Sequence, residues 1–162
     1  MGSPLFNWQP LVWLSYMADV ELYGFGPRGF HTTNLLLHAA NAVLLFTWLR
    51  KLTGRELDSL FVAAVFAVHP LHVESVEWIS ARKDVLSMFF GLLTLLAWER
   101  YLRLKSRRQF AVVCLAFLAS LMAKQLFVTL PVLLLLLDFW PGQRLVPLVG
   151  RPLLAVEPTV EL

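Results

Sequence analysis

The chain has 162 residues, of which 58% are hydrophobic and 15% are charged, and its formal net charge is +3. With a mean hydropathy of +0.66 it is far more apolar than a typical soluble domain, so the composition predicts an integral membrane protein. The single cysteine, Cys114, excludes an internal disulfide and a CxxC metal site. The basic cluster at 103–108 lies between apolar segments, which favours a cytoplasmic loop, and no nucleic-acid partner is expected.

The N-terminal region, residues 1–29, is rich in aromatic residues and is interrupted by Pro10, Gly24, Gly26 and Pro27. This pattern predicts an outward-facing amphipathic helix at the membrane interface, followed by a turn.

About five hydrophobic segments follow, so we predict an all-α polytopic membrane bundle with a transmembrane domain at 30–145 and a cytoplasmic tail at 146–162. The segments are residues 30–49, 57–72, 84–104, 109–123 and 125–140. A helix that crosses the roughly 30 Å hydrocarbon layer needs about 20 residues. The first and third segments are long enough, whereas the second reaches that length only with its HPLH end, which places His69 and His72 at the membrane surface.

Lys124 divides the last two segments. A single helix through both would hold Lys124 in its middle, where a charge costs about 2.5 to 3.5 kcal/mol. We therefore predict two short arms in a hairpin, with Lys124 and Gln125 at its tip.

Lys and Arg are distributed unevenly between the predicted loops, which sets the orientation. One side holds ten of the 14, namely Arg50, Lys51, Arg55, Arg100, Arg103, Lys105, Arg107, Arg108, Arg144 and Arg151. The other side holds Arg28, Arg82, Lys83 and Lys124. The first side is predicted to be cytoplasmic, so the charged loop at 69–84 faces outward.

Four polar residues, His31, Asn34, His38 and Asn41, follow one face of the first membrane helix. They either form hydrogen bonds that join the helices or line a substrate cleft.

The stretch HPLHVESVEWISARKD at 69–84 collects ionisable groups at the outer surface. His69, His72 and Glu74 are possible metal ligands, although Pro70 disrupts the helix that would align the two imidazoles. Alternatively, a carboxylate beside the imidazoles acts as a general base. Phosphate is then held by Arg82, Lys83 or Lys124. Two simpler interpretations remain, in which Asp84 stabilises the N-terminus of the third helix and Lys124 snorkels toward water.

Three blocks carry a family resemblance: QPLVWLSYMADVELYGFGPRGFHTTNLLLHAANAVLLF, FAVHPLHVESVEWISARKDVLSMFF and LMAKQLFVTLPVLLLLLDFWP. Over roughly residues 7–145 the chain resembles bacterial membrane proteins that join a polytopic glycosyltransferase-like domain to tetratricopeptide repeats. These are similar to the eukaryotic transmembrane and tetratricopeptide repeat O-mannosyltransferases.

The resemblance implies a GT-C-type bundle that transfers a sugar from a polyprenyl-phosphate-linked donor to a protein or other acceptor. It also implies a location in the bacterial inner membrane, with residues 69–84 facing the periplasm. It implies that Glu74, His72 and Asp84 are catalytic, and that Lys124 lies near the lipid phosphate. The remaining substrate-binding candidates are Arg82, His69 and Gln125. No cofactor or bound metal is expected, although a divalent metal stays an alternative.

The chain also departs from the family pattern. It has Ala123, Lys124 and Gln125 where SKP or SKE is common, and it lacks an acidic motif in a first outward loop and tetratricopeptide repeats. We therefore expect a fragment that is inactive without the remainder of the enzyme. Two other hypotheses are a nonenzymatic membrane scaffold that binds lipid or a partner helix, and a transporter subunit with a polar path through His38, Asn41 and Lys124.

Overall fold

The computed structural model describes residues 9–139, apart from the side chains of residues 71 and 73–75. All its regular structure in this range is helical, in agreement with the predicted all-α class. Residues 1–128 and 129–162 form two separate units, so the last helix, α7 (Leu130–Phe139), is described by itself.

The first two helices begin at prolines and end at glycines. α1 (Pro10–Tyr23) and α2 (Pro27–Thr53) both begin with proline, whose fixed φ suits the first helical turn. Gly54 ends α2 with a φ of 70°, and its N–H donates to the carbonyl of Arg50. α1 exposes apolar residues such as Trp13 and Met17 but buries Asp19, so its acidic group faces the protein. The assignment of residues 1–29 to the membrane interface stays a prediction.

The segment 69–84, predicted as a charged loop on the outer side, is largely helical, and its placement outside the membrane stays a prediction. After α3 (Glu56–Val68), His69 is extended and Pro70 begins the short helix α4 (Pro70–Glu77). A 3₁₀ turn, η1 (Ile79–Ala81), leads directly into α5, which begins at Arg82. The predicted helix interruption at Pro70 is confirmed, because proline cannot continue the preceding hydrogen-bond ladder.

The interruption at Lys124 is also confirmed. α5 (Arg82–Leu104) is followed by α6 (Arg107–Ala123), and Lys124 ends α6 in an extended conformation. A 3₁₀ segment, η2 (Gln125–Thr129), then precedes α7.

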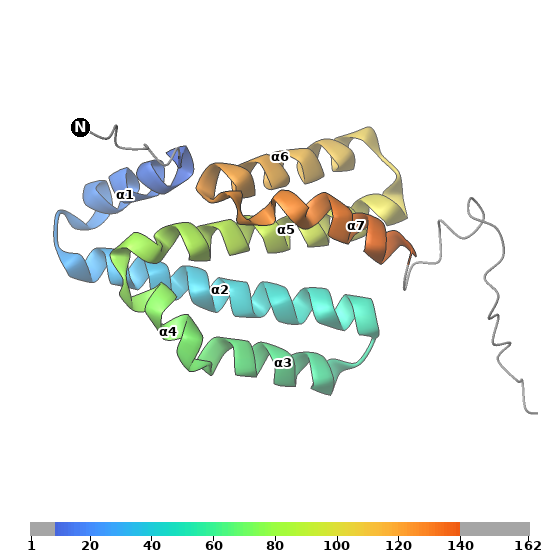
Figure 1. Ribbon diagram of the computed structural model, residues 1–162, viewed down its shortest axis with the longest axis horizontal. Helices are drawn as coiled ribbons and strands as arrows, with labels where there is room; N and C mark the ends of the chain where they lie inside the picture. Colours follow the sequence, from blue (N-terminus) through green and yellow to red (C-terminus); the bar gives the residue numbers. More distant parts are fainter. Residues whose placement is uncertain (1–8, 140–162) are drawn as a thin grey trace, which may run out of the picture. The chain divides into compact units, whose positions relative to one another are not determined.

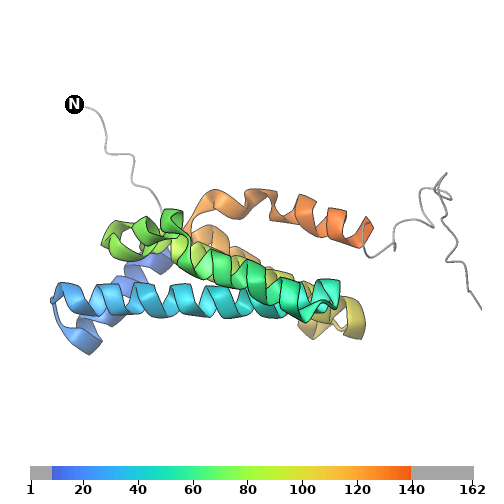
Figure 2. The same ribbon diagram turned by 90° about the horizontal axis from the view of Figure 1, so that it is seen from below.

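Helices α2, α3, α5 and α6 pack side by side, with α5 between α2 and α6 (Figure 1). The view from below also shows α3 running beside α2 (Figure 2). Small residues bring α5 and α6 close together: Ser87 and Ser120 are fully buried, and the Ser120 hydroxyl donates to the Ser87 carbonyl at 3.0 Å.

The polar face of α2 joins helices, as one of the two interpretations predicted. Asn34 donates to the carbonyls of Val76 and Trp78 at 3.2 Å each, and Asn41 donates to the carbonyl of Val85 at 2.9 Å. His38 is also buried and lies 3.1 Å from the carbonyl of Ala67, whereas His31 is exposed. Asn34, His38 and Asn41 therefore stabilise the bundle.

Two of the described helical stretches, Pro27–Thr53 and Ile79–Leu104, are long and apolar enough to cross a membrane. The other predicted segments correspond to shorter helices. That all five segments cross the membrane stays a prediction.

Candidate functional site

A buried ion pair joins α5 to α1. The side chain of Arg82 is fully buried, that of Asp19 is 5% exposed, and Arg82 Nη2 donates to Asp19 Oδ2 at 2.5 Å. Arg82 Nε donates to the amide oxygen of Asn34 on α2. The guanidinium also lies over the ring of Tyr16, 5.3 Å from its centroid. A buried charge requires such compensation, so Arg82 connects three helices.

These contacts give Arg82 a different environment from the exposed loop that was predicted. Its Nη2 also donates to the carbonyl of Phe30 at 2.9 Å, and its Nη1 lies 3.4 Å from the hydroxyl of Ser15. Because the guanidinium of Arg82 is directed into the protein, its contacts favour a structural role, in which Arg82 holds the start of α5 against α1 and α2. The role of Arg82 in substrate binding stays a prediction.

A second ion pair, between Lys124 and Asp84, is accessible to solvent. Asp84 lies in the first turn of α5, as predicted, and Lys124 directly follows α6. The ammonium of Lys124 donates to Asp84 Oδ1, and the two side chains are 35% and 30% exposed. The Lys124 carbonyl accepts a hydrogen bond from Ser87 at 3.2 Å, which fixes the backbone beside the charge. The Lys124 ammonium therefore remains partly accessible to solvent.

Three histidine rings and the ring of Phe66 form a cluster near the α3–α4 junction. The ring centroid of His72 lies 4.4 Å from that of Phe66, 5.9 Å from that of His38 and 6.0 Å from that of His69. Burial lowers the pKa of His72, and the neighbouring His38 and His69 lower it further. His72 is therefore biased toward the neutral form that accepts a proton.

The other predicted site residues are placed as follows. Glu74 lies in α4, but its side chain is outside the described part of the structure, and Gln125 is exposed at the start of η2. Among the described residues, no group of three or more His, Cys, Asp or Glu side chains is arranged to hold a metal ion. The possible metal site at His69, His72 and Glu74 stays untested, because the structure does not describe the side chain of Glu74.

We use the term polar end for the end of the bundle that contains Asp19, Arg82, Asp84, Lys124 and His72. The opposite end, at the C-termini of α2 and α5 and the N-terminus of α6, is called the basic end. Its ion pairs join Arg50 to Glu56 and Lys51 to Glu99. The candidate site residues thus belong to the polar end.

The similar proteins found by sequence comparison carry the same name, protein O-mannosyl-transferase. The chain is 31% identical to "Protein O-mannosyl-transferase Tmtc1" of Drosophila melanogaster over 134 residues, which cover 79% of this chain and 16% of the relative. It is 35% identical to human "Protein O-mannosyl-transferase TMTC1" over 97 residues, 59% of this chain and 11% of the relative. With human "Protein O-mannosyl-transferase TMTC4" it shares 37% identity over 111 residues, 60% of this chain and 15% of the relative.

The chain is homologous to a segment of these O-mannosyl-transferases. It spans between 10% and 16% of the length of the first relatives that it matches. No family model matches the chain. No solved structure matches it either.

The homology confirms the predicted relation to O-mannosyltransferases but does not assign individual residues. Sequence reasoning missed Asp19, which forms the buried pair with Arg82, and it did not pair Asp84 with Lys124. The sequence signal for the first pair was weak: Ser15 and Asp19 are four residues apart on α1, which places them on one helix face but does not indicate Arg82 as their shared partner. The second pair joins residues 40 positions apart, and nothing local in the sequence indicates it.

Proposed function

We propose that this chain is the donor-phosphate-binding segment of a membrane glycosyltransferase. The enzyme would transfer a sugar from a polyprenyl-phosphate-linked donor to a protein or other acceptor on the outward face of the bacterial inner membrane. The homology to O-mannosyl-transferases supports the reaction class, and the two long apolar helices support membrane association. The observation that carries the proposal is the accessible pair of Lys124 and Asp84 at the polar end.

Lys124 would bind the donor phosphate as a point charge. Its ammonium donates to Asp84, and phosphate binding would release this carboxylate. Buried Arg82 would act as a positioning residue, because its contacts with Asp19 and Asn34 fix the first turn of α5, which carries Asp84.

The transfer step needs a base for the acceptor hydroxyl. Glu74 is the proposed base, with His72 as the neighbouring group that accepts or relays the proton. The bond between the sugar C1 and the phosphate oxygen breaks with its electron pair moving to the phosphate, while the acceptor oxygen bonds to C1. His69, Gln125 and Asp84 are the further candidate contacts of donor and acceptor. Regions of the relatives that lie outside the aligned segment would complete the transferase.

The distribution of charge supports an outward-facing polar end. Within residues 9–139 the basic end and its loops hold eight Lys and Arg residues, whereas the polar end holds four. Cytoplasmic loops carry the excess of positive charge, so we propose that the basic end faces the cytoplasm.

Donor binding can be tested with a photoactivatable analogue of polyprenyl-phosphate mannose, added to membranes that contain the chain. We expect a crosslink that unlabelled polyprenyl-phosphate mannose competes away. Lys124→Gln should reduce the crosslink about tenfold or more, since hydrogen bonds to charged groups contribute about 1.5 to 3 kcal/mol. Lys124→Arg should retain most of it, because the positive charge remains.

The matched control is Lys105→Gln, which removes one lysine at the basic end, where the side chain is exposed. The control should leave the crosslink unchanged. Equal crosslinking by Lys124→Gln and Lys105→Gln, or a crosslink that the unlabelled donor cannot compete away, would overturn the proposal.

A further inference from the structure

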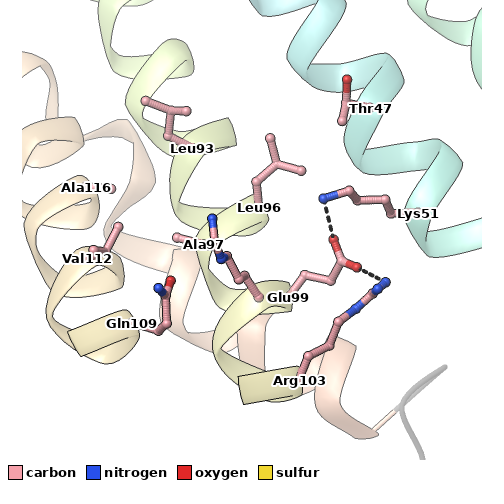
Figure 3. Close-up of a pocket in the computed structure, with 11 residues that line it drawn as sticks. Thr47, Lys51, Leu93, Leu96, Ala97, Glu99, Arg103, Gln109, Val112 and Ala116 are labelled. Atoms are coloured by element: carbon pink, nitrogen blue, oxygen red, sulfur yellow. Dashed lines mark hydrogen bonds and ion pairs between the residues drawn. The ribbon is translucent and has the colours of Figure 1, made fainter. Parts of the chain in front are cut away.

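A groove at the basic end lies far from the candidate transferase site. It has a volume of about 530 Å³ and is formed by α2, α5 and α6 (Figure 3). Its inner wall is apolar and consists of Leu93, Leu96, Ala97, Val112 and Ala116. Its mouth is polar and consists of Thr47, Lys51, Glu99, Arg100, Arg103 and Gln109. The groove is therefore amphipathic along its length.

The charges at the mouth favour an anion. The mouth holds three cations, Lys51, Arg100 and Arg103, and one carboxylate, Glu99, which gives a formal charge of about +2 at neutral pH. Figure 3 shows Lys51 and Arg103 reaching Glu99 from opposite sides. Lys51 Nζ lies 3.6 Å from Glu99 Oε2, and this buried oxygen has no hydrogen-bond partner among the described residues. The Lys51 contact is thus a loose ion pair, which an added anion can replace.

The depth of the groove matches one leaflet of a bilayer. Leu93 is at the middle of α5, and Arg103 is in its last turn. The ten residues between them correspond to about 15 Å of helix, which is half of the roughly 30 Å hydrocarbon layer. If α5 crosses the membrane, the cations lie at the level of the lipid phosphates while the apolar wall extends toward the midplane.

We propose that this groove binds one anionic phospholipid of the leaflet that faces the basic end. Its phosphate contacts Lys51, Arg100 and Arg103, and one acyl chain lies along the wall that contains Leu93 and Val112. Glu99 contacts Lys51 and Arg103, and its negative charge lowers the affinity for a phosphate. The inference rests on the membrane placement proposed above, but it does not depend on the transferase reaction.

The test is native mass spectrometry of the purified 162-residue chain, released from mixed micelles of phosphatidylglycerol and phosphatidylcholine. We expect one phosphatidylglycerol to be retained in preference to phosphatidylcholine. Each of Lys51→Gln, Arg100→Gln and Arg103→Gln should weaken retention about fivefold, since each Lys or Arg at an anionic lipid surface contributes about 1 kcal/mol. Arg108→Gln removes the same charge from α6 outside the groove and should have no such effect.

Glu99→Gln distinguishes a binding site from a general loss of folding. It removes the competing carboxylate, so it should strengthen phosphatidylglycerol retention even if it slightly destabilises the protein. Ala116→Leu narrows the apolar wall and should weaken retention without a change of charge. Glycerol 3-phosphate, which has the headgroup but no acyl chain, should compete poorly.

Three results would overturn the inference. They are equal retention of the two lipids, equal effects of the groove variants and Arg108→Gln, and full competition by glycerol 3-phosphate, which would indicate a site for free phosphate. The groove variants leave Lys124 intact. Donor crosslinking at the polar end therefore reports separately on the proposed transferase function.

Discussion

The buried pair of Arg82 and Asp19 makes a quantitative prediction about stability. Asp19→Asn keeps the shape of the side chain but leaves the guanidinium without its carboxylate, in a place where Arg82 is fully buried. Breaking such a pair usually costs about 3 to 5 kcal/mol. Asn34 and the Phe30 carbonyl still accept hydrogen bonds from Arg82, so we expect about 3 kcal/mol, which corresponds to a factor of roughly 150 in the unfolding equilibrium.

The assay is equilibrium unfolding of the detergent-solubilised chain by titration with sodium dodecyl sulfate, followed by circular dichroism. The matched control is Asp58→Asn, because the Arg55–Asp58 pair also has a short contact, at 2.6 Å, but its side chains are 76% and 53% exposed. The control should cost less than about 1 kcal/mol. The double variant Asp19→Leu, Arg82→Met removes both charges and should recover part of the loss. If Asp19→Asn is no more costly than Asp58→Asn, Arg82 does not connect the helices as described.

Two further predictions concern the histidine cluster and the packing of α5. Because burial and the neighbouring His38 and His69 lower the pKa of His72, the folded chain binds fewer protons than the unfolded chain, and its free energy of unfolding should fall as the pH drops below about 6.5. In stability measurements between pH 7.5 and 5, His72→Gln should flatten this fall, and a His72→Gln curve as steep as that of the wild type would contradict the assignment. Gly91→Ala should destabilise the chain by about 1 to 3 kcal/mol, because the added Cβ would lie 2.9 Å from Cζ of Phe127. The control is Gly26→Ala, whose Cβ meets nothing within 4 Å. Equal thermal unfolding temperatures for the two variants would refute the predicted contact.

The approximate helix positions followed from the sequence, but not all of their bounds. The segment predicted at 30–49 corresponds to α2, which Pro27 begins and Gly54 ends, whereas the break at Pro70 between α3 and α4 was predicted. Each acts on its own backbone, through a fixed φ, a left-handed cap or a missing N–H, so no tertiary information is needed. The helical character between the predicted segments 57–72 and 84–104 was missed because the charged residues there suggested solvent, whereas the fold buries Arg82 and begins α5 there.

The pairing of side chains was less accessible to sequence reasoning. The polar stripe of α2 predicted that Asn34 and Asn41 turn inward, but their hydrogen-bond partners lie 42 to 44 positions away. The contacts of Arg82 with Asp19 and of Lys124 with Asp84 likewise depend on which helices become neighbours. Residue type therefore predicted that these groups need partners, whereas only the packed bundle shows which partners they have.

The proposed function rests on the claim that the polar end faces outward and the basic end faces the cytoplasm, and the lipid proposal needs the two ends to lie on opposite sides of the membrane. Ser80 in η1 and Ser106 before α6 report on the two ends, and their replacement by cysteine changes neither charge nor size appreciably. The measurement is labelling with a membrane-impermeant maleimide in intact bacterial cells, using Ser80→Cys and Ser106→Cys in a Cys114→Ala background. The account predicts that Cys at position 80 reacts in intact cells and Cys at position 106 reacts only after permeabilisation of the inner membrane. Labelling at position 106 in intact cells, or at both positions alike, would contradict it.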